Sequence, residues 1–418
     1  MTADAPGTTG GPAVGGERRG RRRWEAGSPA PAQGAAAPDR VLEEVRLRAM
    51  GQGGGLSEVD LASAVRASGR VMGAASSTEM LRSLSDDIHG LGILERLAQV
   101  PGTTDILIDA NGRVWVDGSA GLHASDLGFT EPGQIRALAV RLAAAGGRRL
   151  DDAQPFVDVS LGNYRIHAVL PPISTGGPLL SIRIKGNRNQ RLETLVADAG
   201  WLAALGAIVA AKLNFLVSGG TGAGKTTLLA AMLARVPGDE RILVVEDSQE
   251  LAPAHPHLVG LQSRGGNVEG AGEIGMDTLV RQALRMRPDR LVVGECRGAE
   301  VREFLGAMNT GHEGAAGTVH ANSVTAVPAR LAAMGALANM DAAATALQAA
   351  SALDVLIHVW RDPATGTRGP VQLGRVVLTD AGNLAVRMIR ETGPGNCDAE
   401  AIDWFRTRLQ AAGESSPW

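Results

Sequence analysis

This sequence contains few cysteines, lysines and aromatic residues, and each scarcity excludes something. Its 418 residues include two cysteines, Cys296 and Cys397, which are too few for a disulfide framework and favour a reducing compartment. Aromatic residues make up 3% of the chain, so its cores must be built from leucine, valine, isoleucine and alanine. The only lysines are Lys185, Lys212 and Lys225, and arginine therefore carries nearly all the positive charge.

Long apolar runs and a strong net charge are also missing. No apolar run reaches the length of a membrane span. The basic cluster Arg18–Arg23 is followed by a stretch rich in proline and alanine, and not by the apolar segment of a signal peptide. The formal net charge of -3 argues against a general nucleic-acid coat. These features predict a cytoplasmic protein.

Composition divides the chain into five segments. Residues 1–38 are rich in glycine, alanine and proline and predict a disordered tail, whose arginines leave contact with an anionic partner open. Residues 39–80 predict a helical lead-in, interrupted by glycines. Residues 81–185 predict a smaller α+β domain, and the polar residues 186–195 a linker. Residues 196–418 alternate strands and helices in the manner of a parallel sheet.

Hydrophobic spacing predicts the elements of both domains. The smaller domain should contain a β-hairpin, a helix and three further strands: Asp105–Asp109 with Arg113–Asp117, Ile135–Ala145, Phe156–Leu161, Tyr164–Leu170 and Leu179–Ile184. The larger domain should contain five strands: Leu213–Ser218, Arg241–Glu246, Leu291–Gly294, Gly317–His320 and Val355–Trp360. Its expected helices are Lys225–Arg235, Met276–Met286, Ala299–Met308 and Pro328–Leu337.

A glycine-rich stretch between the first of these strands and its helix predicts a phosphate-binding loop. It matches the pattern G-x-x-x-x-G-K-[ST] in the required strand–loop–helix context. Backbone N–H groups of the turn and the positive end of the helix dipole would bind the β-phosphate. Lys225 would reach the β- and γ-phosphates of ATP, and the Thr226 hydroxyl would coordinate Mg²⁺. The predicted nucleotide-binding residues are Gly219, Gly220, Thr221, Gly222, Ala223, Gly224, Lys225, Thr226 and Thr227.

Two apolar strands end in carboxylates that would lie beside this loop. One strand ends at Glu246, and the other ends at Gly294 and Glu295, where kinases and G proteins have an aspartate. One carboxylate would order the metal and the other would polarise the attacking water. Either acid could instead be a surface residue at a strand end, and the sequence leaves this alternative open.

The order of four motifs resembles that of the type II/type IV secretion ATPase superfamily. After the phosphate loop come the acidic box Glu246–Glu250, the stretch LRMRPDRLVVGECRG from Leu284 to Gly298, and TGHEGAAGTVHANS from Thr310 to Ser323. Among its branches, the chain looks most like the one that powers tight-adherence (Flp-type) pili, with the conjugation and type IV secretion ATPases close by. The resemblance implies an α/β fold with a RecA-like P-loop ATPase domain, a smaller N-terminal α+β domain and a homo-hexameric ring.

The resemblance also implies roles for the acidic residues. Glu295 would be the catalytic glutamate that orients or deprotonates the attacking water. Glu246 would support the metal and the water, so that Thr226, Glu246 and Glu295 form the predicted metal-binding set. Arg297 and Arg285 would stiffen the site through ion pairs, although Arg285 could equally be a solvated charge at a helix end.

Further roles are implied for basic side chains. His312 and His320 would contact or sense the γ-phosphate. Arg165 and Arg183 would reach the phosphates from the smaller domain or from a neighbouring subunit, as an arginine finger does. With the lysine and the two acids, the predicted catalytic residues are Glu295, Glu246, Lys225, Arg183, Arg165, His312 and His320.

The function implied is that of a motor. A hexamer at the inner face of the cytoplasmic membrane would hydrolyse ATP with Mg²⁺ and act on an inner-membrane platform protein to assemble a pilus, without binding nucleic acid. A type IV secretion or conjugation ATPase is the alternative. A DNA-translocating motor is less favoured, because the chain has one tyrosine and five phenylalanines for base stacking. A nucleotide-gated scaffold is the last alternative, and it would not need Glu295.

Overall fold

The computed structural model describes residues 90–118, 121–185, 190–264, 272–363, 365–393, 395, 397–415 and 417. The predicted tail, the predicted helical lead-in, residues 81–89 of the predicted smaller domain and residues 186–189 of the predicted linker lie outside this range. The contacts along the chain separate a unit Met1–Ile88 from a unit His89–Trp418, and the description below concerns the second.

The first part of this unit is a six-stranded antiparallel sheet. A short 3₁₀ turn, η1 (Gly92–Leu94), and helix α4 (Glu95–Ala98) precede it. Its order is β3-β2-β1-β6-β5-β4. The strands are β1 (Thr103–Ile108), β2 (Arg113–Gly118), β3 (His123–Gly128), β4 (Phe156–Leu161), β5 (Tyr164–Val169) and β6 (Leu179–Ile184).

Side-chain alternation gives this sheet one apolar and one polar face. Buried residues such as Ile106 and Ile182 pack against Leu142 of helix α5 (Pro132–Ala145) in one core. Residues at the alternate positions, among them Arg165 and Arg183, point away from that core and make ion pairs with acidic residues instead.

The second part is an eight-stranded sheet with the order β14-β13-β12-β7-β11-β10-β8-β9. Six neighbouring strands are parallel, and β13 and β14 add an antiparallel edge. The strands are β7 (Phe215–Gly219), β8 (Ile242–Glu246), β9 (Leu258–Gln262), β10 (Arg290–Cys296), β11 (Ala316–His320), β12 (Val355–Arg361), β13 (Arg368–Leu378) and β14 (Leu384–Glu391).

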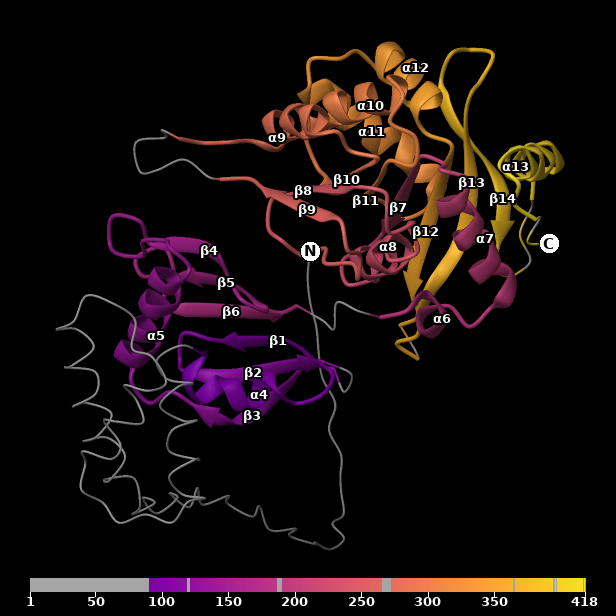
Figure 1. The fold of residues 1–418 in the computed structure, drawn as a ribbon. Helices are drawn as coiled ribbons and strands as arrows, with labels where there is room; N and C mark the ends of the chain where they lie inside the picture. The colour runs from indigo at the N-terminus through magenta and orange to yellow at the C-terminus, as the bar shows by residue number, and fades with distance from the viewer. Residues whose placement is uncertain are drawn as a thin grey trace, which may run out of the picture. The chain divides into compact units, whose positions relative to one another are not determined.

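Helices cover both faces of this sheet (Figure 1). One face packs against α6 (Leu192–Leu195), α7 (Ala199–Ala210), α8 (Lys225–Leu233) and α13 (Ala399–Ala411). The other face packs against α9 (Met276–Ala283), α10 (Glu300–Asn309), α11 (Val327–Leu337) and α12 (Ala342–Ala352), with the short turns η2 (Leu284–Met286) and η3 (Val324–Ala326) beside them. Because both faces are buried, the central strands are continuous apolar runs.

The register of the parallel strands brings their carboxyl ends to one edge. His320 of β11 pairs with Gly219 of β7, and Val293 of β10 pairs with Val245 of β8. Ligands of open α/β sheets bind at this edge, so the register gathers the predicted motifs where a nucleotide would bind.

The α/β fold class predicted from the sequence is confirmed. The five predicted strands of the larger sheet correspond to β7, β8, β10, β11 and β12. The sequence pattern does not predict β9, the antiparallel edge formed by β13 and β14, or helices α7 and α12.

Candidate nucleotide site

The phosphate loop runs from the end of β7 into α8. Gly222 and Gly224 have φ angles of +71° and +100°, which L side chains rarely adopt. Gly219 is required for space, because a Cβ there would lie 2.7 Å from the Val359 carbonyl oxygen. These glycines let the backbone turn tightly below the first turn of α8, where Thr226 and Thr227 lie.

Lys225 is the buried cation of this loop. Its side chain is 7% exposed, and its Nζ donates hydrogen bonds to the carbonyl oxygens of Gly219 and Gly220 at 3.1 and 2.9 Å. Burial lowers the pKa of Lys225, while the nearby carboxylates of Glu295 and Glu250 oppose that shift. A desolvated ammonium held on neutral carbonyls is well placed to take a phosphate oxygen instead.

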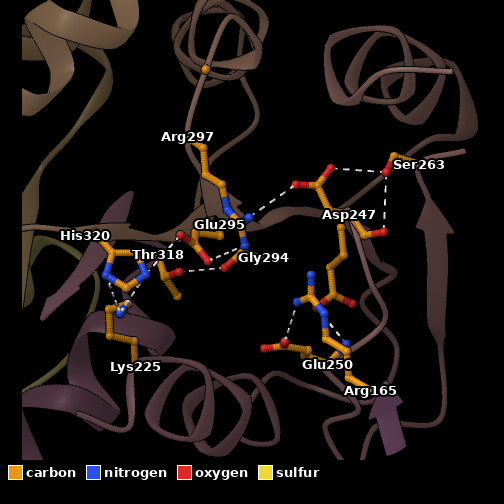
Figure 2. Close-up of polar contacts among 12 residues, drawn as sticks. Arg165, Lys225, Asp247, Glu250, Ser263, Gly294, Glu295, Arg297, Thr318 and His320 are labelled. Atoms are coloured by element: carbon orange, nitrogen blue, oxygen red, sulfur yellow. Dashed lines mark hydrogen bonds and ion pairs between the residues drawn. The ribbon is translucent and has the colours of Figure 1, made fainter. Parts of the chain in front are cut away.

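A chain of contacts joins this lysine to Glu295 through His320 (Figure 2). The Lys225 Nζ lies 3.3 Å from the His320 Nδ1, and the His320 Nε2 lies 3.1 Å from the Glu295 Oε1. Burial first, and then the Lys225 charge, lower the pKa of His320, so the ring is neutral at pH 7. A neutral ring can accept from the lysine at one nitrogen and donate to the glutamate at the other.

Arg297 holds Glu295 from its other side. The Arg297 Nη2 lies 2.8 Å from the Glu295 Oε2, and its Nη1 lies 4.0 Å from Asp247. Each carboxylate oxygen of Glu295 therefore has a basic partner, which fixes the direction of the side chain beside the phosphate loop.

Glu246 lies beneath this cluster with its carboxylate turned inward. It is 6% exposed, and its Oε1 accepts hydrogen bonds from the backbone N–H groups of Glu250 and Leu251 at 3.0 and 2.9 Å. Burial raises the pKa of Glu246 to about 7 despite those two hydrogen bonds. One carboxylate oxygen of Glu246, a residue predicted to support the metal, therefore holds the turn after β8.

The Glu246 side chain also explains the glycine before Glu295. A Cβ on residue 294 would lie 2.5 Å from the Glu246 Cγ, so only glycine fits. The Gly294 carbonyl oxygen accepts a hydrogen bond from the Thr318 hydroxyl at 2.7 Å. The sequence Gly294-Glu295 thus fits a strand end that passes over a buried glutamate.

One of the two predicted arginine fingers is linked to the acidic box. Arg165 lies 2.7 Å from Asp158 on its own sheet and 3.3 Å from the Glu250 Oε1 (Figure 2). Arg183 instead pairs with Asp105 of β1 at 3.1 Å and makes no contact with the phosphate loop within the described residues. The predicted pair is therefore not brought together at the phosphates of its own subunit.

Two further predicted residues lie at the opposite edge of the sheet. His312 precedes β11, and its Nδ1 lies 3.1 Å from the Ala307 carbonyl oxygen at the end of α10. His320 is the last residue of β11, so the two histidines lie at opposite ends of this strand. Arg285 lies in η2, before β10 begins. Neither His312 nor Arg285 is therefore brought beside the phosphate loop of its own subunit, and the roles predicted for them stay predictions.

Sequence reasoning missed the buried pair Ser218–His358. The Ser218 hydroxyl lies 3.0 Å from the His358 Nδ1, and both side chains are buried directly below the phosphate loop. Burial and the Lys225 charge lower the pKa of His358. The available signal was a histidine inside an otherwise apolar strand, which indicates a buried polar partner.

The donor set suits a magnesium ion bound together with phosphates. Among the described residues, no three His, Cys, Asp or Glu side chains form a group that would hold a metal alone. Mg²⁺ keeps several waters and takes one or two protein oxygens plus substrate phosphates. The Thr226 hydroxyl and the Glu295 carboxylate fit that requirement. Cys296 is buried, and this burial raises the pKa of its thiol well above the usual value.

The chain matches known proteins over most of its length. Residues 87–403 match the family model described as "Type II/IV secretion system protein". The chain is 54% identical over 343 residues to the "Putative conjugal transfer protein Rv3659c" of Mycobacterium tuberculosis, covering 79% of this chain and 97% of that protein. It is 29% identical over 265 residues to the type IV secretion system protein VirB11 of Bartonella quintana, covering 53% of this chain and 73% of that protein.

Among solved structures, the chain matches the VirB11 ATPase of the Brucella suis type IV secretion system in complex with sulphate. It shares 24% identity with this chain, and the match covers 70% of this chain and 95% of that one with a TM-score of 0.38. In the part of this chain that the structure describes, no helix combines the length and apolarity needed to cross a bilayer.

Proposed function

Because this chain belongs to the type II/IV secretion system protein family, we propose that it is a motor that hydrolyses ATP to drive a conjugation or type IV secretion machine. The observation that carries the proposal is the contact chain Lys225–His320–Glu295 beside the phosphate loop. A relative named for conjugal transfer and one named for type IV secretion support this reading over the tight-adherence pilus branch.

The residues of the phosphate loop and those beside it would have separate roles in ATP hydrolysis. Its backbone N–H groups and α8 bind the phosphates, and Lys225 exchanges the carbonyls of Gly219 and Gly220 for phosphate oxygens. The Thr226 hydroxyl and the Glu295 carboxylate would hold Mg²⁺, which would supply positive charge beside the phosphates. Glu295 orients the attacking water, and His320 and Arg297 hold its carboxylate in place.

Glu246 would contribute to the same step by fixing the backbone that carries Glu295. Its two amide hydrogen bonds fix the turn after β8, and its side chain fills the space over Gly294. We assign it a positioning role for Glu295 in place of the predicted contact with metal.

We propose that a cavity beside the phosphate loop binds the adenosine part of ATP. It has a volume of about 750 Å³ and is lined by residues before and at the start of α7, by the start of β13 and by the end of β14, including Val196, Trp201 and Arg368. The Arg368 Cδ lies 3.6 Å from the point where Gly224 would carry a Cβ, so this cavity adjoins the phosphate loop. An adenine base would pack on its apolar side chains.

Assembly into a ring with further copies, docked on a membrane machine, completes the proposal. Arg183 is exposed at the sheet surface and would reach the phosphates of a neighbouring copy. Loss of the γ-phosphate would release such contacts and convert hydrolysis into movement.

The test is Mg-ATP hydrolysis per subunit across protein concentration, with Lys225→Ala and Glu295→Gln alongside. Turnover should rise with concentration, and the two variants should lose roughly 10²-fold or more. Lys225→Ala should also lose nucleotide binding, whereas Glu295→Gln should keep it. A Glu295→Gln variant with unchanged turnover would refute the motor, and ATP binding without hydrolysis at any concentration would favour the scaffold.

A further inference from the structure

A second cavity adjoins the phosphate loop from the side of α11. Its volume is about 510 Å³. Its walls are the first glycines of the loop, the end of β11 with the residues after it, and one face of η3 and α11: Gly219, Gly220, His320, Ala321, Asn322, Ala326, Ala329, Arg330 and Ala333. It therefore opens on the carbonyls that hold Lys225 and on the histidine that contacts Glu295.

Arg330 is the one permanently charged residue among those lining this cavity. The helix positions around Arg330 carry alanines, whose small side chains leave room for the long Arg330 side chain to reach over the loop. Asn322 adds a neutral amide with two further donors. A wall with one guanidinium and one amide matches the oxygens of a phosphate group.

Arg330 also differs from the other arginines near the site. Arg165 is paired with Asp158 and Glu250, and Arg297 with Glu295. Arg330 is exposed and makes no ion pair within the part of the chain that the structure describes. Its charge nevertheless acts on His320, which places the guanidinium within electrostatic reach of the lysine–histidine–glutamate chain. No carboxylate has to be displaced before this arginine can bind an anion.

We propose that Arg330 binds the terminal phosphate of ATP from the α11 side and makes the site prefer ATP over ADP. The inference rests on the proposed function, since it needs a nucleotide in the phosphate loop. Lys225 would reach the β- and γ-phosphates and would therefore contact both nucleotides. The cavity lined by Arg330 starts at Gly219 and Gly220, whose carbonyl oxygens hold Lys225, so Arg330 would meet only the third phosphate. Arg330 thus belongs to the same subunit as the loop, unlike an arginine finger from a neighbour.

The experiment compares binding of fluorescent ADP and of a slowly hydrolysed ATP analogue to wild type, Arg330→Ala and Arg330→Lys. Arg330→Ala should weaken binding of the ATP analogue about tenfold or more and leave the affinity for ADP within about twofold of wild type. The reason is that a charge-assisted hydrogen bond is lost with the ATP analogue alone. Arg330→Lys should recover part of the loss. Arg302→Ala, an exposed arginine of α10 outside the cavity, is the matched control.

Each result decides between a phosphate contact and a structural role. If Arg330→Ala binds both nucleotides equally more weakly, or has a lowered melting temperature with both, Arg330 supports the fold. If its affinity for both nucleotides is unchanged, Arg330 is a solvated charge. Either overturns the inference while wild-type turnover, and with it the proposed function, stands. If the wild type binds neither nucleotide, both proposals fall together.

Discussion

Glu246 and Gly294 touch across two neighbouring strands, and this contact sets the position of the candidate catalytic glutamate. A Cβ on residue 294 would lie 2.5 Å from the Glu246 Cγ and 2.9 Å from its Oε1. The next residue is Glu295, whose carboxylate lies between His320 and Arg297. The buried Glu246 and the half-buried Glu295 are therefore coupled through one glycine.

Replacing that glycine should damage both stability and turnover. Gly294→Ala forces the Glu246 side chain or the end of β10 to move, at a cost of roughly 1–3 kcal/mol in the free energy of unfolding. Because the moved backbone carries Glu295, kcat should fall as well. Gly260→Ala in β9 is the control, since a Cβ there meets nothing within 4 Å. Urea denaturation and ATPase assays on both variants test this, and equal behaviour of the two would contradict it.

Glu246 should make the stability of the nucleotide-free protein fall as pH rises. Its pKa is raised from 4.5 to about 7 by burial, so between these values the folded state holds a proton that the unfolded state has lost. The carboxyl thus contributes its full share of stability below pH 4.5 and loses roughly 2–4 kcal/mol by pH 7, with little change above.

The variant Glu246→Gln removes this titration but can still accept the amide hydrogen bonds. Unfolding measured from pH 5 to 8 with EDTA present should show a shallower decline in Glu246→Gln than in wild type. Parallel curves for the two proteins would show that Glu246 is ionised in the fold throughout, as a metal ligand would be.

Replacing the two histidines of the TGHEG…TVHANS block should change kcat to different extents. His320 contacts both Lys225 and Glu295, whereas His312 contacts the end of α10 at the other edge. His320→Gln should lower kcat roughly 10²-fold because the glutamate loses its orienting partner. His312→Gln should stay within about twofold of wild type. Steady-state assays decide this, and a large loss in His312→Gln with ring assembly intact would indicate a site shared between subunits.

The motifs could be predicted from the sequence because each is local. The glycines and Lys225 of the loop occupy fixed positions at the end of an apolar strand, and parallel strands bring Glu246, Glu295 and His320 to the same edge. The position of His312 could not be predicted, because the pattern alone does not say at which end of a strand a loop residue lies. Its distance from the loop follows from the start of β11 at Ala316.

Other features could not be predicted because their signals are weak. Helix α7 is apolar on nearly all sides, so it shows little helical periodicity. Strand β14 is the edge strand of the sheet and β13 is its neighbour, and both mix buried and half-exposed positions, which blurs their alternation. Arg330 and Arg368 could not be singled out in a chain whose positive charge is nearly all arginine.

Arg368 should affect the binding of ATP without affecting its hydrolysis. It lines the larger cavity and lies against Gly224, whereas Glu295 and His320 lie at the carboxyl ends of β10 and β11 and contact each other. Arg368→Ala should therefore raise KM about three- to tenfold and leave kcat within about twofold, since a contact equal in ground and transition states is lost.

The neighbouring arginine offers a matched control for this prediction. Arg361 pairs with Arg368 across the β12–β13 ladder, but it does not line the cavity. Removing either arginine relieves the same repulsion between like charges directly opposite each other, so any difference between the two variants reports on the cavity. If Arg361→Ala raises KM as much as Arg368→Ala, the effect is one of net charge near the loop, and the adenosine must bind elsewhere.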